Sequence, residues 1–338
     1  MPDKCIAIET TPPNEGEFIK ALSARLKAKI VKDNVSGIMR RDAHPKMHGL
    51  VKAEFIINAN TLDQDLRVGL FKESKSYKAW IRFSNQDGEI KPDIGRDIRG
   101  VAIKLMGVPG EKILTEEKDE ETHDFILIST NVFVTKNIED FDGLIKSITG
   151  NLLLKLCFFV THWRVLWNVL KSMKKFANPL QIRYFSTTPY LFGKYAVKYA
   201  LTPQNNNTDT IPKKPSDDFL RIAMIKQLQN SDVYFDFSVQ FQMDVNEMPI
   251  EDAGKLWQES KSPFIKVATI RILKQEFNSD DQNKFGENLS FTPWHALPEH
   301  RPLGGINRGR KIVYQLISQF RHEFNKTPRK EPHSWYCN

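Results

Sequence analysis

The sequence is poor in cysteine and lacks the spacings that cysteine-dependent folds require. Its 338 residues include Cys5, Cys157 and Cys337, which are odd in number and far apart. A disulfide framework needs paired cysteines and a zinc knuckle needs a CxxC pair, so the sequence favours neither. We therefore expect a protein of a reducing, cytoplasmic setting.

Several other signatures are missing. Neither GxGxxG nor GxxxxGK[ST] occurs, which excludes the common phosphate-binding loops, and no repeat of fixed period is visible. The opening residues, MPDKCIAIETTPPNEGE, contain no basic stretch followed by an apolar one. They predict no secretory signal.

Positive charge is only mildly in excess. The 49 Lys and Arg against 41 Asp and Glu give a net charge of +8, spread along the chain without a dense basic run. This distribution disfavours nucleic acid as a partner. A solvated surface explains it, and basic groups that bind an anionic ligand such as a carboxylate or phosphate are the alternative.

Apolar residues, by contrast, make up 40% of the chain, enough for a buried core. The most apolar segment, residues 151–170, is interrupted by Lys155, His162, Arg164 and Asn168, so it is a poor membrane span. We expect a helix buried against the core or a partner. The alternative is a helix that lies on a membrane or contacts lipid substrates, which gives a peripheral membrane contact through 151–170.

The order of the expected elements predicts an α+β protein with a mainly antiparallel sheet, large enough to close into a barrel. We place an N-terminal tail and helix at 1–30 and one domain at 31–330. The expected strands lie at 51–58, 78–84, 99–106, 123–130, 234–243 and 265–273. The other expected elements are a loose tail at 1–16, a helix at 17–32, a helical region at 138–200, a polar loop at 203–218 and a closing helix from 310.

The segment RRDAHPKMHG contains two histidines four residues apart, His44 and His48. On a helix this spacing suits a metal pair, but Pro45 pushes His44 toward extended backbone, which disfavours that interpretation. A histidine presented from a loop before the first strand can act as an acid and base near neutral pH. An ordinary loop histidine is the alternative, and this fragment alone favours it.

Two further segments carry charge beside strands. In WIRFSN, Arg82 and Ser84 share one strand face. If that face is buried, the arginine needs an anion and the serine can hydrogen-bond a histidine; otherwise it is a solvated face. Before the next strand, Arg96, Asp97 and Arg99 suit a surface ion-pair cluster.

The segment RKIVYQLISQFR, residues 310–321, predicts a helix that places a phenol beside an apolar stripe. Tyr314 lies in the stripe, Arg310 is one turn before it, and Arg321 is two turns after it. A tyrosinate can ligate haem iron, and its ionisation requires nearby positive charge because the reference pKa of tyrosine is about 10. For RxxxY alone chance spacing is strongly favoured, because two residues four apart occur by chance in most helices. The stripe consists of Val313, Ile317, Phe320 and Phe324.

The order of these segments resembles the haem catalase family. RxxH, RFS, RDxRGxAxK, an apolar strand ending in VF, and RxxxY with an arginine seven residues later follow one another from about Arg40 to Arg321. The closing PWHALPEHRPLGGINRGRKIVY looks like the short catalase-related haem proteins, some of which act on fatty-acid hydroperoxides. The resemblance implies an antiparallel β-barrel with surrounding helices and a haem b cofactor with its iron.

The resemblance also implies roles for individual residues. His44 matches the distal histidine, Ser84 the serine that supports it, Tyr314 the proximal iron ligand, and Arg310 the arginine that keeps this tyrosine ionised. The apolar stripe beside Tyr314 is then the wall of the haem pocket. The residues that match the propionate-binding arginines and the phenylalanines of the pocket are Arg41, Arg82, Arg321, Phe133 and Phe141.

The sequence departs from the family pattern at two places. The distal asparagine falls on Ile128, and the nearest candidates are Ser129, Thr130 and Asn131, of which we take Asn131 as the second distal donor. The usual Pro-Asp after the proximal tyrosine is Gln315-Leu316. The first departure weakens the expectation of hydrogen peroxide dismutation.

We therefore expect a haem-dependent oxidoreductase, of catalase or peroxidase type, that cleaves the O–O bond of hydrogen peroxide or of an organic or fatty-acid hydroperoxide. We also expect a homo-oligomer. The alternative function is a non-catalytic haem-binding carrier or sensor. A basic barrel that stacks nucleic-acid bases on its aromatic strands is disfavoured, because alternating Phe residues usually form a core.

Overall fold

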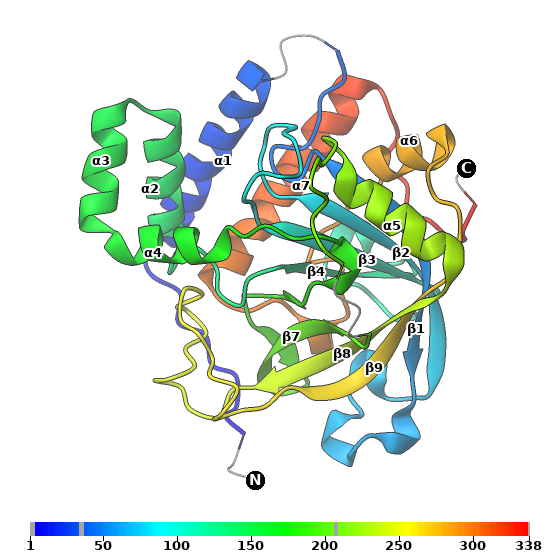
Figure 1. Cartoon of the computed structure of the whole chain (residues 1–338). Coiled ribbons are helices and arrows are strands. Elements are labelled where there is room, and N and C mark those ends of the chain that lie inside the picture. The colour runs from blue at the N-terminus through cyan, green and yellow to red at the C-terminus, as the bar shows by residue number, and fades with distance from the viewer. Residues whose placement is uncertain (1–3, 34–36, 206–208, 337–338) are drawn as a thin grey trace.

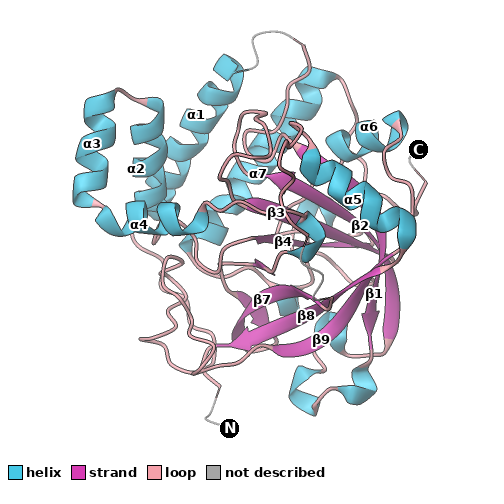
Figure 2. Ribbon diagram, viewed as in Figure 1, coloured by secondary structure: helices cyan, strands magenta, loops and turns pink. Residues whose placement is uncertain are grey.

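The computed structural model describes residues 4–33, 37–205 and 209–336. Cys337 lies outside the described residues. Within these ranges, nine strands form one antiparallel sheet in the order β5-β4-β3-β2-β1-β9-β8-β7-β6. Strand β5 pairs with both β4 and β7, so eight of the strands close into a barrel (Figure 2). The predicted fold class, an α+β protein with a closed antiparallel barrel, is confirmed. The strands are β1 (Met47–Ile57), β2 (Lys75–Asn85), β3 (Arg99–Met106), β4 (Thr122–Ile128), β5 (Tyr184–Phe185), β6 (Tyr190–Phe192), β7 (Tyr195–Pro203), β8 (Val233–Phe241) and β9 (Ile265–Ile272).

Alternation along the strands fills the barrel with aromatic rings. Side chains of successive residues on a strand point to opposite faces, so Phe235, Phe237 and Val239 of β8 all enter the core. The ring of Phe237 lies 5.1 Å from that of Phe55 and 4.8 Å from that of Phe125. The barrel is therefore a packed frame, and any binding site lies on its outer face or at its ends.

Helices cover the outside of the barrel. One layer combines the N-terminal, middle and C-terminal parts of the chain, because α1, α2 and α7 pack together through a shared apolar cluster (Figure 1). Helices α5 and α6 pack against β1. The helices are α1 (Glu15–Asp33), α2 (Ile138–Thr149), α3 (Leu152–Thr161), α4 (Trp163–Ser172), α5 (Phe219–Asn230), α6 (Asp280–Asn288) and α7 (Gly305–Asn325). Short 3-10 helices occupy 59–61, 64–66, 69–71, 115–117, 179–181 and 298–300.

The expected helical region at 138–200 is too long. Helix α4 ends at Ser172, and 184–203 contain three strands instead. Two of them, β5 and β6, have two and three residues, which is too short for alternation to show in the sequence. Both strands form by pairing with β7, and the pairing of β5 with β4 and β7 closes the barrel. Tertiary contacts therefore override the local pattern. Helices α5 and α6 were not expected at all.

The N-terminal helix belongs to the same packed body as the barrel. Ile19, Leu22 and Leu26 of α1 are buried against Ile138 of α2. The expected boundary near residue 30 falls inside α1, and the two-part division stays a prediction.

The apolar segment at 151–170 is not one helix and is mostly exposed. It bends by 99° at His162, between α3 and α4. No residue of α3 is buried, and Trp163 of α4 is 70% exposed. The expectation of a helix buried against the chain's own core is therefore wrong. Among the described residues no single helix is long and apolar enough to cross a membrane, although this bent pair passes that test of length and composition.

Candidate functional site

His44 is presented from a loop against the outer face of the barrel. Its backbone is in the left-handed region, with φ of 64°, which a non-glycine residue adopts only when its surroundings hold it there. The amide of His44 donates to the carbonyl of Gln86 at 3.3 Å. Its Nδ1 lies 2.9 Å from Oγ of Ser84 on β2. Two residues forty positions apart in the sequence thus form one hydrogen-bonded pair, as the sequence predicts for His44 and Ser84.

A glycine makes room for the imidazole. A Cβ added at Gly100 of β3 would lie 2.4 Å from Cε1 and 2.6 Å from Nδ1 of His44. Any side chain at this position would therefore force the ring away from Ser84. Sequence reasoning missed this role, although Gly100 stands in the segment RDxRGxAxK, where a close approach of a ring to a strand is one reason for a glycine.

Electrostatics keep His44 neutral. Burial lowers the pKa of His44, and the charges of Arg82, Arg310 and Arg41 lower it further, to about 3. At neutral pH the imidazole therefore carries a proton on one ring nitrogen only, and the other nitrogen can act as a base. Arg310 comes from α7 and Arg82 from β2, so positive charge from both elements acts on His44.

Three arginines converge beside the histidine. Arg41 and Arg321 both donate to the backbone carbonyl of Glu287, at 3.0 and 2.6 Å, and Nη1 of Arg41 lies 3.1 Å from the Glu287 carboxylate. Arg82 is 3% exposed, and its Nη2 lies 3.7 Å from the same carboxylate. Neither Nε nor Nη2 of Arg82 makes a hydrogen bond with the described residues.

This cluster holds more positive charge than its own carboxylate balances. Burial lowers the pKa of Arg321 to about 9, and burial together with repulsion from Arg41 lowers the pKa of Arg82 well below its usual value. A guanidinium nevertheless stays protonated at neutral pH. The shifts therefore report unfavourable charge that a bound anion would relieve. The face of Arg82 is neither solvated nor inside the barrel; it is the outer face, covered by α6.

Helix α7 supplies the other half of the region. Nη1 of Arg310 donates to Oγ1 of Thr188 at 3.4 Å, and its guanidinium lies 5.5 Å above the ring of Phe133. The ring of Phe133 in turn meets that of Phe141 at 5.4 Å, edge to face. Tyr314 is half-buried one turn after Arg310. Arg310, Phe133 and Phe141 therefore lie together beside α7.

The apolar stripe of α7 has a different role from the one expected. Val313 and Ile317 pack against α1 and α2, Phe320 lies under the ammonium group of Lys27 at 4.7 Å, and Phe324 is 48% exposed. The stripe is thus mainly a helix–helix contact and not the wall of a pocket. Tyr314, which borders it, lines a small cavity on the neighbouring face of the helix.

The structure also places Asn131 and Arg99. Asn131 is exposed after β4 and makes no hydrogen bond within the described part of the chain, so its role as the second distal donor stays a prediction. Arg99 is not in a surface ion-pair cluster: it is 1% exposed and donates to Oδ1 of Asn85 at 2.6 Å and to the carbonyl of Asp93 at 3.0 Å. Glu287 was missed, because a single glutamate on a polar helix gives no signal in the sequence.

His48 lies on β1 and contacts other residues than His44 does. It is 1% exposed on β1, and its Nε2 lies 2.6 Å from Oδ1 of Asn85. Burial lowers its pKa to about 3, and the charges of Arg99 and Lys46 add to the effect, while the hydrogen bond to Asn85 opposes it. His44 and His48 therefore have different hydrogen-bond partners, Ser84 and Asn85.

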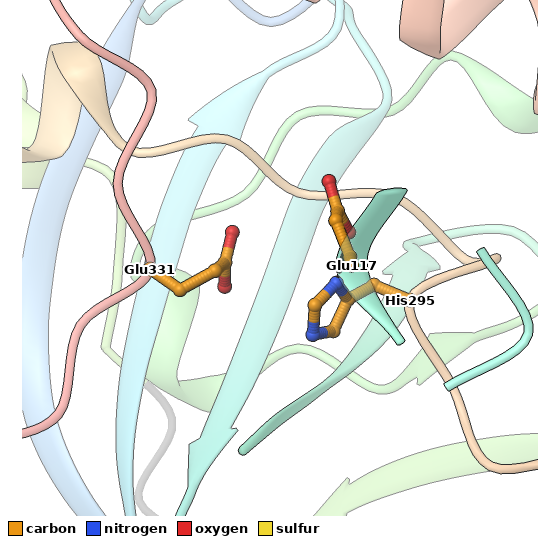
Figure 3. Close-up of side chains that lie close together, drawn as sticks. All are labelled: Glu117, His295 and Glu331. Carbon is orange, nitrogen blue, oxygen red and sulfur yellow. Dashed lines mark hydrogen bonds and ion pairs between the residues drawn. The ribbon is translucent and has the colours of Figure 1, made fainter. Parts of the chain in front are cut away.

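A group of metal-ligating side chains lies elsewhere. Ligand atoms of Glu117, His295 and Glu331 lie within 4.8 Å of one another (Figure 3). Glu331 is ion-paired with Lys104 at 2.6 Å, and Glu117 contacts both Arg329 and His295. Both ring nitrogens of His295 are hydrogen-bonded within the cluster. These groups are already balanced, so they form an ion network that fixes the C-terminal segment to the barrel.

Comparison with known proteins identifies the architecture. The chain matches no protein-family model and no curated protein sequence. Its structure is similar to catalase A from Saccharomyces cerevisiae, with a TM-score of 0.67 and 18% identity over 95% of this chain and 67% of that one. The chain has the catalase fold.

Other solved catalases agree. A fungal catalase gives a TM-score of 0.64 at 17% identity over 89% of this chain, and a bacterial catalase gives 0.63 at 17% over 95%. The chain spans 61% and 64% of the length of these two proteins. Identity at this level shows the catalase fold and leaves the activity to be argued from the site.

The depressed pKa of His48 predicts a pH dependence of stability. Its folded pKa of about 3 lies below the ordinary value of 6.5, so the unfolded chain binds more protons between these values. The stability that neutral His48 contributes to the fold is complete above pH 6.5 and is lost as the pH falls toward its folded pKa. In the wild type, protonation linked to His48 should lower the free energy of unfolding by about 2 kcal/mol between about pH 7 and pH 5. His48→Gln, which can still donate to Asn85, should lack this decrease when stability is measured by urea titration. The exposed His333→Gln should show the same change of unfolding free energy with pH as the wild type. The same change in His48→Gln would refute the assignment.

Proposed function

We propose that the region between α7 and the outer face of β2 and β3 binds haem b and that the protein is an oxidoreductase that cleaves peroxide O–O bonds. The observation that carries the proposal is the buried arginine cluster. Arg82 has two donor nitrogens without a hydrogen-bond partner among the described residues, and Arg41 and Arg321 lie beside it. A planar cofactor with two carboxylates supplies the missing anions.

The donor set fits such a cofactor. Tyr314 would ligate the iron, with Arg310 one turn away to favour the ionised phenol. Phe133 and Phe141 supply apolar rings, and Arg41, Arg82 and Arg321 would hold the propionates. His44 lies on the barrel side. Haem iron, when bound, supplies the redox chemistry; the chain supplies binding, orientation and proton transfer.

His44 would transfer the proton. The ring is neutral at pH 7, so it can accept the hydroxyl proton of a hydroperoxide and deliver it to the other oxygen, which becomes the leaving water or alcohol. Ser84 fixes the ring through Nδ1 at 2.9 Å, and Gly100 leaves the space that this position needs. These two residues act by positioning the base.

The lack of the family's distal asparagine supports an organic hydroperoxide as the substrate class. A second polar donor beside the distal histidine would assist the handling of hydrogen peroxide, and this chain has Ile128 at that position. A fatty-acid hydroperoxide carries its own apolar chain and carboxylate for binding. We therefore place this class ahead of hydrogen peroxide dismutation, with a non-catalytic haem carrier or sensor as the alternative.

Tyr314→Phe tests the iron ligand. The wild-type chain, saturated with haemin, should show a Soret band with high-spin ferric features, and Tyr314→Phe should lose these features because the phenolate oxygen is gone. Tyr336→Phe, at a residue that is 77% exposed, is the control. The wild-type protein should then consume the conjugated diene of added linoleate hydroperoxide faster than free haemin does. An unchanged spectrum in Tyr314→Phe would refute the ligand, and haem binding without peroxide consumption would favour the carrier.

Gly100→Ala tests the positioning of His44. The added methyl group would displace the ring from Ser84, so hydroperoxide turnover should fall by roughly 10²–10⁴-fold, the usual contribution of a positioned acid–base group, while the haem spectrum remains. His44→Ala should lower hydroperoxide turnover by about the same factor. Gly95→Ala is the control, because an added Cβ there meets only a carbonyl at 3.4 Å. Full activity in Gly100→Ala would contradict the role of His44.

A further inference from the structure

The helices α3 and α4 form an apolar surface that the rest of the described chain leaves open. They lie at the edge of the molecule, with α3 outside α2 (Figure 1). The side chains on residues 152–170 that are most exposed belong to Leu152, Leu153, Leu156, Val160, Trp163 and Leu170, at 57–78%. We call them the α3–α4 surface. An apolar ten-residue helix without a buried residue gains little from packing in water, and short isolated helices are marginal.

The two helices are nevertheless well defined. The side chain of Asn151 caps α3 by accepting from the amide of Leu154 at 3.0 Å. Helix α4 is attached to the body through the buried Val165 and Ser172, whose hydroxyl lies 2.9 Å from that of Thr130. The chain therefore holds α4 by one side and turns its other side, together with α3, toward solvent.

Charge indicates what covers this surface. No Asp or Glu occurs between Asp142 and Asp209, while the segment contains Lys155 and Lys171 in addition to other basic residues. Both lysines are exposed, and the ammonium group of Lys171 lies 5.0 Å above the ring of Trp167. Basic side chains beside leucines and tryptophans are the composition of helices that lie in the headgroup layer of an anionic membrane.

Carboxylates of other elements do not cancel this charge. Asp252 is already paired with Arg164 at 3.0 Å, and Asp140 of α2 lies 3.8 Å from His162. Both carboxylates are largely buried, at 17% and 22% exposure. Neither carboxylate forms an ion pair with Lys155 or Lys171 in the described part of the chain, and both lysines are exposed.

A second copy of the chain fits this surface less well. A symmetric dimer places the same patch on both subunits, which would bring Lys155 and Lys171 against their own copies without a carboxylate in the segment to pair with them. We propose that the α3–α4 surface docks on an anionic lipid surface, with the apolar side chains in the acyl boundary and the lysines at the phosphate level. The 99° bend lets both helices lie on one plane without crossing the bilayer.

Vesicle co-sedimentation of the full-length chain tests the proposal, and it requires no haem, so the outcome is independent of the haem site. The protein should sediment with vesicles of phosphatidylcholine and phosphatidylglycerol and much less with phosphatidylcholine alone. Lys155→Gln and Lys171→Gln should each weaken binding about fivefold, the factor that corresponds to about 1 kcal/mol per lysine at an anionic surface. High salt should weaken the wild type in the same direction.

Leu153→Glu combined with Trp163→Glu should abolish binding. Because both residues are exposed, at 68% and 70%, the thermal unfolding midpoint should not fall. Ile222→Glu combined with Val245→Glu changes two apolar residues elsewhere on the molecule that are 55% and 53% exposed, and this variant should bind like the wild type. Equal binding to neutral vesicles would overturn the anionic partner. No vesicle binding, with a dimer that the Leu153 and Trp163 pair dissociates in sedimentation velocity, would show that a second copy covers the surface.

Discussion

The functional region depends on keeping guanidinium groups out of water. Arg82 on β2 is covered by α6, and Arg41 and Arg321 reach the same place from the distal loop and from α7. Glu287 contacts all three, Arg41 and Arg82 through its carboxylate and Arg321 through its backbone carbonyl. Removal of charge from water is costly unless partners replace it, so the cluster requires a rigid fold, and a bound anion would stabilise it further. The geometry of the site follows from this requirement.

The barrel provides the rigidity. Its interior is filled by aromatic rings in contact, so the outer face of β2 and β3 holds Ser84, Arg82 and Gly100 at fixed positions. Helix α7 packs on α1 and α2 through Val313 and Ile317, which fixes the rotation of the helix and thereby the directions of Arg310 and Tyr314. The apolar stripe thus matters to the site through packing, although it does not line it.

The sequence predicts strongly patterned features and misses those that arise from contacts between distant segments. Alternation in β1–β4, β8 and β9 and the helical period of α7 were visible, and so were His44, Ser84 and the arginines, because charged or polar residues beside apolar strands stand out. The short strands β5 and β6 depend on pairing with β7, and only β5 takes part in barrel closure. Glu287, the buried state of Arg99 and the clearance at Gly100 depend on tertiary contacts that no local pattern records.

The central claim is that the arginine cluster binds the carboxylates of a haem, and haem with esterified propionates tests it most directly. Titration of the apo-protein with haemin, followed by the Soret band, should give tight binding. Haemin dimethyl ester retains the iron and the ring but lacks both charges, and it should bind at least about 100-fold more weakly, since a charged hydrogen bond contributes roughly 1.5–3 kcal/mol. Equal affinity for the two compounds would contradict the account.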